Sequence, residues 1–223
     1  MLLHADLSLR AVVNSADLEW VDSPTPGIRR KMIERDGDEV ARCTSIVSYA
    51  PNSKFPTHMH GGGEEIFVLN GVFEDEYGSY PAGTYIKNPP GSSHAPGSTT
   101  GCTLLVKLRH MRPSDTERVV KFTSEGVWHP GLVPGLSVMQ LDSVETRHTA
   151  LVRWAPGTQF QAHRHWGGEE IFVLEGVFED ELGSYPAGTW IRSPHLSQHN
   201  PRSTTGCLIF VKTGHLSFPL TAT

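Results

Sequence analysis

The sequence predicts an all-β protein made of two similar domains, and three observations support this class. A segment that begins at residue 58 recurs almost unchanged from residue 163. Within each copy, short runs of β-branched and aromatic residues alternate with glycine and proline turns, which is the pattern of sandwiches and barrels. No long stretch combines helical periodicity with a capping residue at its start.

The repeat has the size of a domain. Residues 58–108 align with residues 163–213 without a gap, and 35 of the 51 aligned positions are identical. The similarity extends upstream, where Trp20 corresponds to Trp128 at an offset of 108 rather than 105. Such a period is longer than a solenoid unit of about 20–50 residues. We therefore predict a tandem duplication, with one domain over residues 1–112 and a second over residues 113–223.

The expected strands of the first copy follow one another at short intervals. Residues 66–73 (IFVLNGVF) are rich in β-branched and aromatic residues, and Gly71 is expected to form a turn or bulge within this strand. Residues 84–86 and 103–108 give two further expected strands, separated by turns that contain proline and glycine. The second copy repeats this order, so we expect the same barrel or sandwich twice.

Histidine and glutamate recur in each copy with the spacing of metal ligands. Residues i and i+2 of a strand point to the same face, so His58 and His60 can direct two imidazoles to one point. Glu64 keeps the even spacing, and His94 is expected on a strand that folds back beside them. The alternative, solvated polar side chains on strands, is less favoured because all four residue types recur in register.

Three neutral imidazoles and a carboxylate suit a divalent transition metal. The residue types alone leave zinc, iron, manganese, nickel and copper open, with one ion expected in each domain. The predicted metal ligands are His58, His60, Glu64 and His94 in the first copy and His163, His165, Glu169 and His199 in the second.

The ligand spacing resembles two motifs of the cupin family. HMHGGGEEIFVLNG (58–71) is similar to the first motif, and GTYIKNPPGSSH (83–94) is similar to the second. The second copy departs from the latter with Leu196 at a glycine position, and both copies have serine, Ser98 and Ser203, where an asparagine commonly ends the motif. The resemblance implies two tandem cupin barrels, each a double-stranded β-helix or jelly roll, and hence a bicupin.

A longer string, HGGGEEIFVLNGVFEDEYGSYPAGTYIKNPPGSSHAP from residue 60, resembles the ChrR cupin-like family. That family includes the C-terminal domain of anti-sigma factors, in which two histidines, a glutamate and a later histidine bind zinc. The resemblance implies these roles for the eight residues named above, so we expect zinc in each barrel, with iron, manganese or nickel as alternatives. Such anti-sigma factors hold the sigma factor with a separate N-terminal helical zinc domain that contains a Cys-x2-Cys pair. This chain has no Cys-x2-Cys sequence, and it is already cupin-like from about Trp20, so we expect no tight complex with a sigma factor.

The amino-acid composition limits the classes of partner and the cellular compartment that we expect for this protein. The net charge of −5 argues against nucleic acid, which selects basic surfaces. Asp6 and Arg10 interrupt the apolar N-terminal stretch, so we expect neither a signal peptide nor a membrane span. Three cysteines, Cys43, Cys102 and Cys207, are too few and odd in number for a disulfide framework and favour a reducing cytoplasm. A small-molecule ligand is expected, and a homodimer is left open.

Several acidic residues adjoin the predicted ligands. Glu65 and Glu170 follow the ligand glutamates directly, and strand alternation points them to the opposite face, so a structural role is favoured over metal binding. The acidic runs 74–76 and 179–181 precede a glycine in each copy. A solvated hairpin is favoured for these runs over a second metal site.

Other candidates have a structural alternative that is preferred. Cys102 and Cys207 have no basic neighbour that would activate a thiol, so buried packing is favoured over redox sensing. The second copy carries bulkier residues near the expected site, Trp166, His195 and Leu196. A solvated loop is favoured for His195 over contact with a ligand. If one pocket is specialised for a small molecule, we expect the second.

Three functions are consistent with the sequence. We favour a regulatory or small-ligand-sensing protein with one metal site per barrel. The alternative is a metal-dependent cupin enzyme, such as a dioxygenase or isomerase, that acts on a small organic substrate. In the third, the metal only stabilises the barrel. Four protein ligands complete a tetrahedral zinc site, whereas six-coordinate iron or manganese would retain two open positions, so the coordination number would help to separate these functions.

Overall fold

β-Strands dominate the described part of the chain, which confirms the all-β prediction. The computed structural model describes residues 1–216; residues 217–223, at the end of the predicted second domain, lie outside the described residues. The helices within residues 1–216 are single 3-10 turns, Ser15–Asp17 and Thr123–Glu125. In this part of the chain, no helix has the length and apolar character needed to cross a membrane.

The chain separates into two compact units. The first comprises residues 1–5 and 18–126, and the second comprises residues 6–17 together with the chain from residue 127 onward. This division differs from the predicted boundary after residue 112 in two places. Residues 6–17 lie with the second unit, and residues 113–126 lie with the first. An exchange of two edge strands accounts for both differences.

The first unit consists of short and medium-length strands. They are β1 (Leu2–Leu3), β3 (Val21–Asp22), β4 (Ile28–Gly37), β5 (Ala41–Tyr49), β6 (Ser53–Lys54), β7 (His58–Met59), β8 (Glu64–Asp75), β9 (Gly78–Pro81), β10 (Thr84–Asn88), β11 (Ser93–His94), β12 (Gly97–Ser98), β13 (Cys102–Leu108) and β14 (Val119–Phe122). The three strands that the sequence predicts over 66–73, 84–86 and 103–108 correspond to β8, β10 and β13.

The second unit repeats this series. Its strands are β2 (Ala11–Asn14), β15 (His129–Pro130), β16 (Leu136–Val144), β17 (Arg147–Trp154), β18 (Thr158–Gln159), β19 (His163–Arg164), β20 (Glu169–Asp180), β21 (Gly183–Pro186), β22 (Thr189–Ser193), β23 (Gln198–His199), β24 (Arg202–Ser203) and β25 (Cys207–Thr213).

Apart from its first strand, the main sheet of each unit has the same antiparallel order. It runs β1-β4-β5-β13-β8-β10-β14 in the first unit and β15-β16-β17-β25-β20-β22-β2 in the second. β8 pairs with β10 and β13 through its first half and with β9 through its second half. Gly71 lies where β8 leaves the main sheet, with φ of +74°, and a Cβ there would lie 2.1 Å from the carbonyl oxygen of Gly101. Only glycine tolerates both conditions, which explains the turn or bulge expected at this residue.

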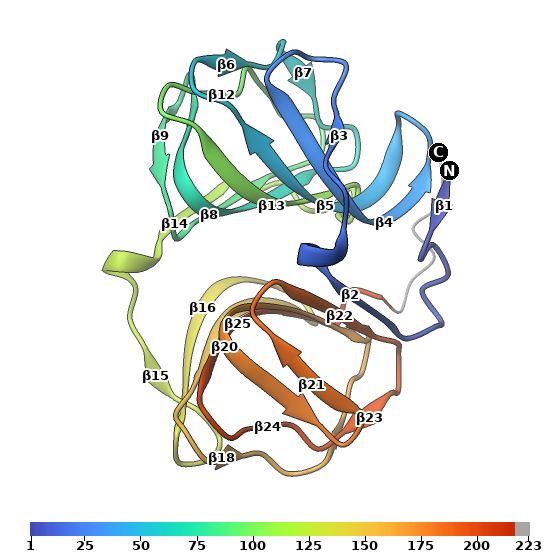
Figure 1. Ribbon diagram of the computed structural model, residues 1–223, viewed down its shortest axis with the longest axis vertical. Coiled ribbons are helices and arrows are strands. Elements are labelled where there is room, and N and C mark those ends of the chain that lie inside the picture. Colours follow the sequence, from blue (N-terminus) through green and yellow to red (C-terminus); the bar gives the residue numbers. More distant parts are fainter. Residues whose placement is uncertain (217–223) are drawn as a thin grey trace. The chain divides into compact units, whose positions relative to one another are not determined.

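The last strand of each main sheet comes from outside the repeat that forms the rest of that sheet. It belongs to the segment that lies before the other repeat in the sequence. β14 precedes the second repeat and pairs with β10 of the first unit, where Val120 lies opposite Ile86. β2 precedes the first repeat and pairs with β22 of the second unit, where Val12 lies opposite Ile191. In Figure 1, the dark blue β2 accordingly lies beside the orange β22. The two pairings are equivalent, because the offset of 108 relates Val12 to Val120.

An apolar core fills the interior of each unit. Ile66, Phe73, Ile86 and Leu104 are among the buried residues of the first core. Their counterparts 105 residues later are buried in the second core. Burial of each large apolar side chain contributes about 1.5–3 kcal/mol, and this core supports the strands that carry the metal-ligand candidates.

Candidate metal centre

The four predicted ligands of the first unit converge on one point. β7 and β11 form a two-stranded pair in which His58 lies opposite His94. His60 lies in the turn after β7, and Glu64 begins β8. One potential ligand atom from each residue lies within 4.8 Å of the others. His60, Glu64 and His94 are buried, and His58 is half-buried.

The second unit repeats the arrangement with its own residues. β19 and β23 pair with His163 opposite His199, His165 follows in the turn, and Glu169 begins β20. The ligand atoms of these four residues also lie within 4.8 Å of one another. The structure thus brings together both sets of four residues, each contained within one unit.

The donor atoms fit a bound divalent metal. Nε2 of His60, His94, His165 and His199 is buried and has no hydrogen-bond partner. Buried polar atoms rarely lack a partner. The lone pair on each of these Nε2 atoms would be satisfied by a cation or by a hydrogen-bond donor. In the first unit, Oε2 of Glu64 lies 3.3 Å from Nε2 of His60 and 3.4 Å from Nε2 of His94. An ion among these atoms would satisfy all of them at once.

Hydrogen bonds on the outer side of the imidazoles set their tautomers. Nδ1 of His58 lies 3.0 Å from the carbonyl oxygen of Pro56 and donates to it. The Ser92 hydroxyl donates to a carbonyl oxygen, so it accepts from Nδ1 of His60 at 2.9 Å. Nδ1 of His94 lies 3.3 Å from Oδ2 of Asp75. Protonation of Nδ1 leaves an Nε2 lone pair on each ring for a metal.

Burial favours the neutral form of three of the site histidines. It lowers the pKa of His60 and His163, and it lowers the pKa of His165 to about 3. Neutral imidazole is the form that binds a metal, so no proton has to be removed from these rings near neutral pH. Burial has the opposite effect on Glu169, whose pKa it raises to about 7. In the absence of a metal, this carboxyl therefore holds a proton across part of the physiological range.

Asp75 and Asp180 are site residues that the sequence prediction missed. A solvated hairpin was expected for both acidic runs, but the side chains of these two aspartates are 0% and 2% exposed. Each lies behind a ligand histidine: Oδ2 of Asp75 is 3.3 Å from Nδ1 of His94, and Oδ2 of Asp180 is 3.6 Å from Nδ1 of His199. One signal for this role was present in the sequence, an aspartate at the same position of both copies. Because each aspartate lies between two glutamates, the run was interpreted as a solvated hairpin.

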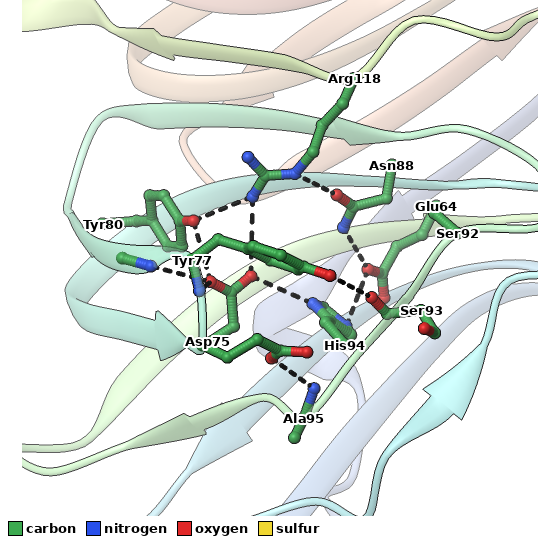
Figure 2. Close-up of polar contacts among 12 residues, drawn as sticks. Glu64, Asp75, Tyr77, Tyr80, Asn88, Ser92, Ser93, His94, Ala95 and Arg118 are labelled. Atoms are coloured by element: carbon green, nitrogen blue, oxygen red, sulfur yellow. Dashed lines mark hydrogen bonds and ion pairs between the residues drawn. The ribbon is translucent and has the colours of Figure 1, made fainter.

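Two chains of hydrogen bonds connect the first centre to Arg118, which directly precedes β14. Its guanidinium donates to the hydroxyl of Tyr80 at 2.9 Å, and that hydroxyl donates to Asp75 at 2.9 Å. Nε of Arg118 also donates to Oδ1 of Asn88 at 3.2 Å, and Nδ2 of Asn88 donates to Oε2 of Glu64 at 3.0 Å. Figure 2 shows that these contacts connect Arg118 to both Glu64 and His94.

The second centre has one of these two hydrogen-bond chains, the one that passes through a tyrosine and an aspartate. Arg10, just before β2, donates to the hydroxyl of Tyr185 at 2.6 Å and lies 3.5 Å from Asp180. Burial and hydrogen bonding act oppositely on Asp180, and the bonds prevail, lowering its pKa to about 2. The position of Asn88 is taken by Ser193, which is too short to repeat the amide contact with the ligand glutamate. Arg10 and Arg118 were not singled out in the sequence because their offset is 108 rather than 105.

The glutamates beside the ligands lie outside both clusters. Glu65 accepts a hydrogen bond of 2.7 Å from the hydroxyl of Tyr85 on the opposite face of the sheet. Glu170 lies 3.5 Å from Nε2 of His215. These contacts agree with the structural role expected from strand alternation.

The remaining candidates have ordinary surroundings. Cys102 and Cys207 are buried, and burial raises the pKa of each thiol to about 11, which agrees with packing rather than redox sensing. His195 is exposed, as expected for a loop, and its Nδ1 accepts from the backbone N–H of Gly167 at 2.9 Å. Trp166 and Leu196 are also exposed near the second centre.

A cavity of about 140 Å³ lies inside the first unit. His58, Glu64 and His94 form part of its wall, together with apolar side chains such as Phe55 and Phe73. The specialised pocket expected in the second copy stays a prediction; the cavity described here belongs to the first unit. A molecule inside it would lie against three of the four metal-ligand candidates.

Sequence and structure comparisons agree on the type of domain. The model of the ChrR cupin-like domain matches residues 8–112 and again residues 116–217. Among curated proteins, no sequence matches the chain at a significant level. The two matches coincide with the two repeats and with the two ligand clusters.

Solved structures share the fold of this chain at low sequence identity. A dioxygenase candidate from Nostoc punctiforme has a TM-score of 0.77 and 15% identity, covering 95% of this chain and 85% of its own. A candidate glyoxylate-induced protein from Pseudomonas aeruginosa has a TM-score of 0.73 and 16% identity, covering 96% and 90%. Oxalate decarboxylase from Lactobacillus farciminis, in complex with formate, has a TM-score of 0.62 and 14% identity, covering 92% and 86%. At these identities, the similarity establishes the fold and leaves the activity open.

Proposed function

We propose that this chain, which belongs to the ChrR cupin-like domain family through both of its halves, binds a small organic molecule at the metal of its first barrel. The observation that carries the proposal is the cavity whose wall includes His58, Glu64 and His94. A metal held only to stabilise a barrel needs no such cavity beside it. Zinc is the preferred ion at both centres, with iron, manganese or nickel as alternatives.

The residues divide into those that hold the metal and those that hold the ligands in place. The ion of the first barrel would be bound by His58, His60, Glu64 and His94. This ion would act as a Lewis acid toward a molecule in the cavity. Asp75 fixes the ring of His94 through Nδ1. Carboxylates in this position typically orient a ligand histidine and increase its basicity.

A regulatory or sensing role has support from the other side chains of the cavity. Burial raises the pKa of Tyr49 and of Cys43, so neither is suited to remove a proton from a bound molecule at neutral pH. A molecule in the cavity would then be bound without being changed by these groups. In this role, occupancy of the first barrel is the signal.

A metal-dependent enzyme is the second candidate, and the same cavity favours it. Four protein ligands leave two positions on a six-coordinate metal, and the cavity would give a substrate access to one of them. Dioxygenase or isomerase chemistry would then depend on the metal rather than on a protein base. Iron with open positions and oxygen uptake would favour this candidate, whereas four-coordinate zinc would favour sensing.

Replacement of the metal by cobalt(II) tests whether the cavity leads to it. Cobalt-loaded protein would be titrated with a panel of small ketones, alcohols and carboxylates while its visible spectrum is recorded. We expect at least one compound to change the spectrum of the wild type. The variant Tyr49→Trp, which places the residue of the second repeat, Trp154, in the first cavity, should retain its metal and lose the response.

The matched control is Tyr85→Trp, the same exchange on the opposite face of the sheet, where the second repeat has Trp190. This variant should respond like the wild type. The proposal fails if no compound changes the spectrum, or if Tyr49→Trp responds as strongly as Tyr85→Trp.

A further inference from the structure

We propose that the cavity of the first barrel recognises a small organic carboxylate, which Arg30 and Arg35 bind at the end away from the metal ligands. Both arginines line the cavity that His58, Glu64 and His94 also line. This inference rests on the proposed function, because it assigns a chemical class to the molecule that would contact the metal.

A β-bulge in β4 directs both arginines inward. Arg30 pairs with Val47 and Arg35 pairs with Cys43, and both partners line the cavity. Arg35 lies five positions after Arg30, and on a regular strand this odd offset would place the two side chains on opposite faces. The pairing with β5 shifts between Met32 and Glu34, so one extra residue returns Arg35 to the inner face.

The charge of these guanidinium groups is poorly compensated. Arg35 is 5% exposed, donates to the carbonyl oxygen of Asp38, and forms no ion pair with a carboxylate of residues 1–216. Nε of Arg30 is buried and has no hydrogen-bond partner. Among residues 1–216, the carboxylate that pairs with Arg30 belongs to Glu39, at 3.5 Å; its side chain is 74% exposed and also lines the cavity. Because a buried charge is costly unless it is paired, the cavity is suited to an anion.

The rest of the cavity selects the shape of that anion. Phe55, Ile66 and Phe73 give the cavity apolar walls. Its volume of about 140 Å³ is close to that of an engineered cavity of about 150 Å³ that holds benzene. Guanidinium groups bind carboxylates through paired hydrogen bonds. The occupant we infer has a carboxylate at one end, a short apolar body, and an oxygen that faces the metal.

The second barrel lacks this feature. By strand register, Val138 lies in the place of Arg30, and Ser143 in the place of Arg35. The duplication therefore preserved both metal-ligand sets and confined the paired cations to the first barrel. These natural replacements also provide the variants for a test.

Isothermal titration calorimetry of the zinc-loaded chain gives that test. The probes are 4-hydroxybenzoate, 2-hydroxybenzoate, 4-oxopentanoate and butanoate, each compared with its neutral amide. We expect at least one carboxylate to bind tenfold or more tightly than its amide. Arg30→Val and Arg35→Ser should each weaken it about tenfold with unchanged metal content. Arg30→Val is the safer variant for folding, because its side chain is 23% exposed.

Two further variants sharpen the result. Arg29→Val removes a neighbouring arginine whose side chain is 53% exposed, and it should bind the carboxylate like the wild type. Glu39→Gln removes the competing anion beside Arg30 and should bind it more tightly.

The outcomes separate this inference from the proposed function. Metal-dependent binding in which amides match carboxylates, or in which both arginine variants bind normally, overturns the carboxylate site and leaves the proposed function intact. Binding that depends on the arginines but is equal in zinc-free protein overturns contact with the metal and retains the anion site. No binding by any carboxylate overturns the inference outright.

Discussion

The side chain of His94 has two distinct nitrogen environments. Its Nδ1 faces Asp75, and its buried Nε2 faces Glu64 at 3.4 Å with no hydrogen-bond partner. A ring held in this way is already oriented for a metal. We expect Asp75→Asn to lower the metal affinity of the first site about 10–100-fold, as is typical for residues that orient ligands. Competition with a chelator of known affinity measures the change.

Glu76→Gln is the control for that experiment, because Glu76 accepts from the backbone N–H of Ala95 rather than from a ligand ring. Its metal affinity should stay within a few-fold of the wild type. Equal losses in the two variants would mean that the acidic run acts on the loop rather than through His94.

The pKa of Glu169 predicts how the second site responds to pH. Burial raises it to about 7, so below pH 7 the metal-free carboxyl holds a proton that a metal must displace. Metal affinity should therefore fall as pH decreases below about 7, by up to about tenfold per pH unit for one proton. The His165 ring, with a pKa of about 3, competes only in stronger acid. Zinc titrations of His94→Ala from pH 8 to 5.5 test this, and a constant affinity from pH 7 to 5.5 would contradict it.

The metal-ligand candidates could be predicted from the sequence, whereas the residues that contact them or line the cavity beside them could not. The eight ligand candidates could be located because strand periodicity and the repeat offset constrain them directly. Asp75 could not, because its role depends on the strand that carries His94 folding back over it. Arg30 and Arg35 were hidden for a related reason: a bulge changes which residues of β4 face inward, and sequence periodicity assumes a regular strand.

At the scale of elements, the exchanged strands β2 and β14 connect each metal centre to the chain before the other repeat. Arg10 precedes the first repeat, yet it contacts Tyr185 and Asp180 of the second unit. We expect Arg10→Ala to weaken the second site by about threefold to tenfold and to leave the first unchanged, since it acts through Asp180. Arg118→Ala should show the reverse preference.

Metal affinities at single sites, measured with the other site removed by His94→Ala or His199→Ala, distinguish these effects. A loss at the first site in Arg10→Ala would mean that each unit keeps its own edge strand. The sequence could not decide this, because β2 and β14 are similar segments, and either could complete either sheet. The strands inside the repeat were predictable, since their turns and apolar residues are local signals.

At the scale of the whole molecule, two metal centres should stabilise two units. A ligand that binds only the folded state contributes RT ln(1 + [metal]/Kd), or about 2.7 kcal/mol at one hundred times Kd. We therefore expect complete removal of metal with a chelator to lower the melting temperature at pH 7.5. The effect should be smaller at pH 5, where protonation of Glu169 already weakens binding at the second centre. Paired melts with and without chelator at each pH, after metal analysis, measure both shifts.

The central claim is that each unit holds its own metal through four residues of its own. Metal analysis of His94→Ala and His199→Ala, beside the wild type and the loop variant His195→Ala, tests it directly. The account predicts about half of the wild-type metal in each of the first two variants and full content in His195→Ala. Complete loss of metal in either single variant, or no loss in both, would contradict it.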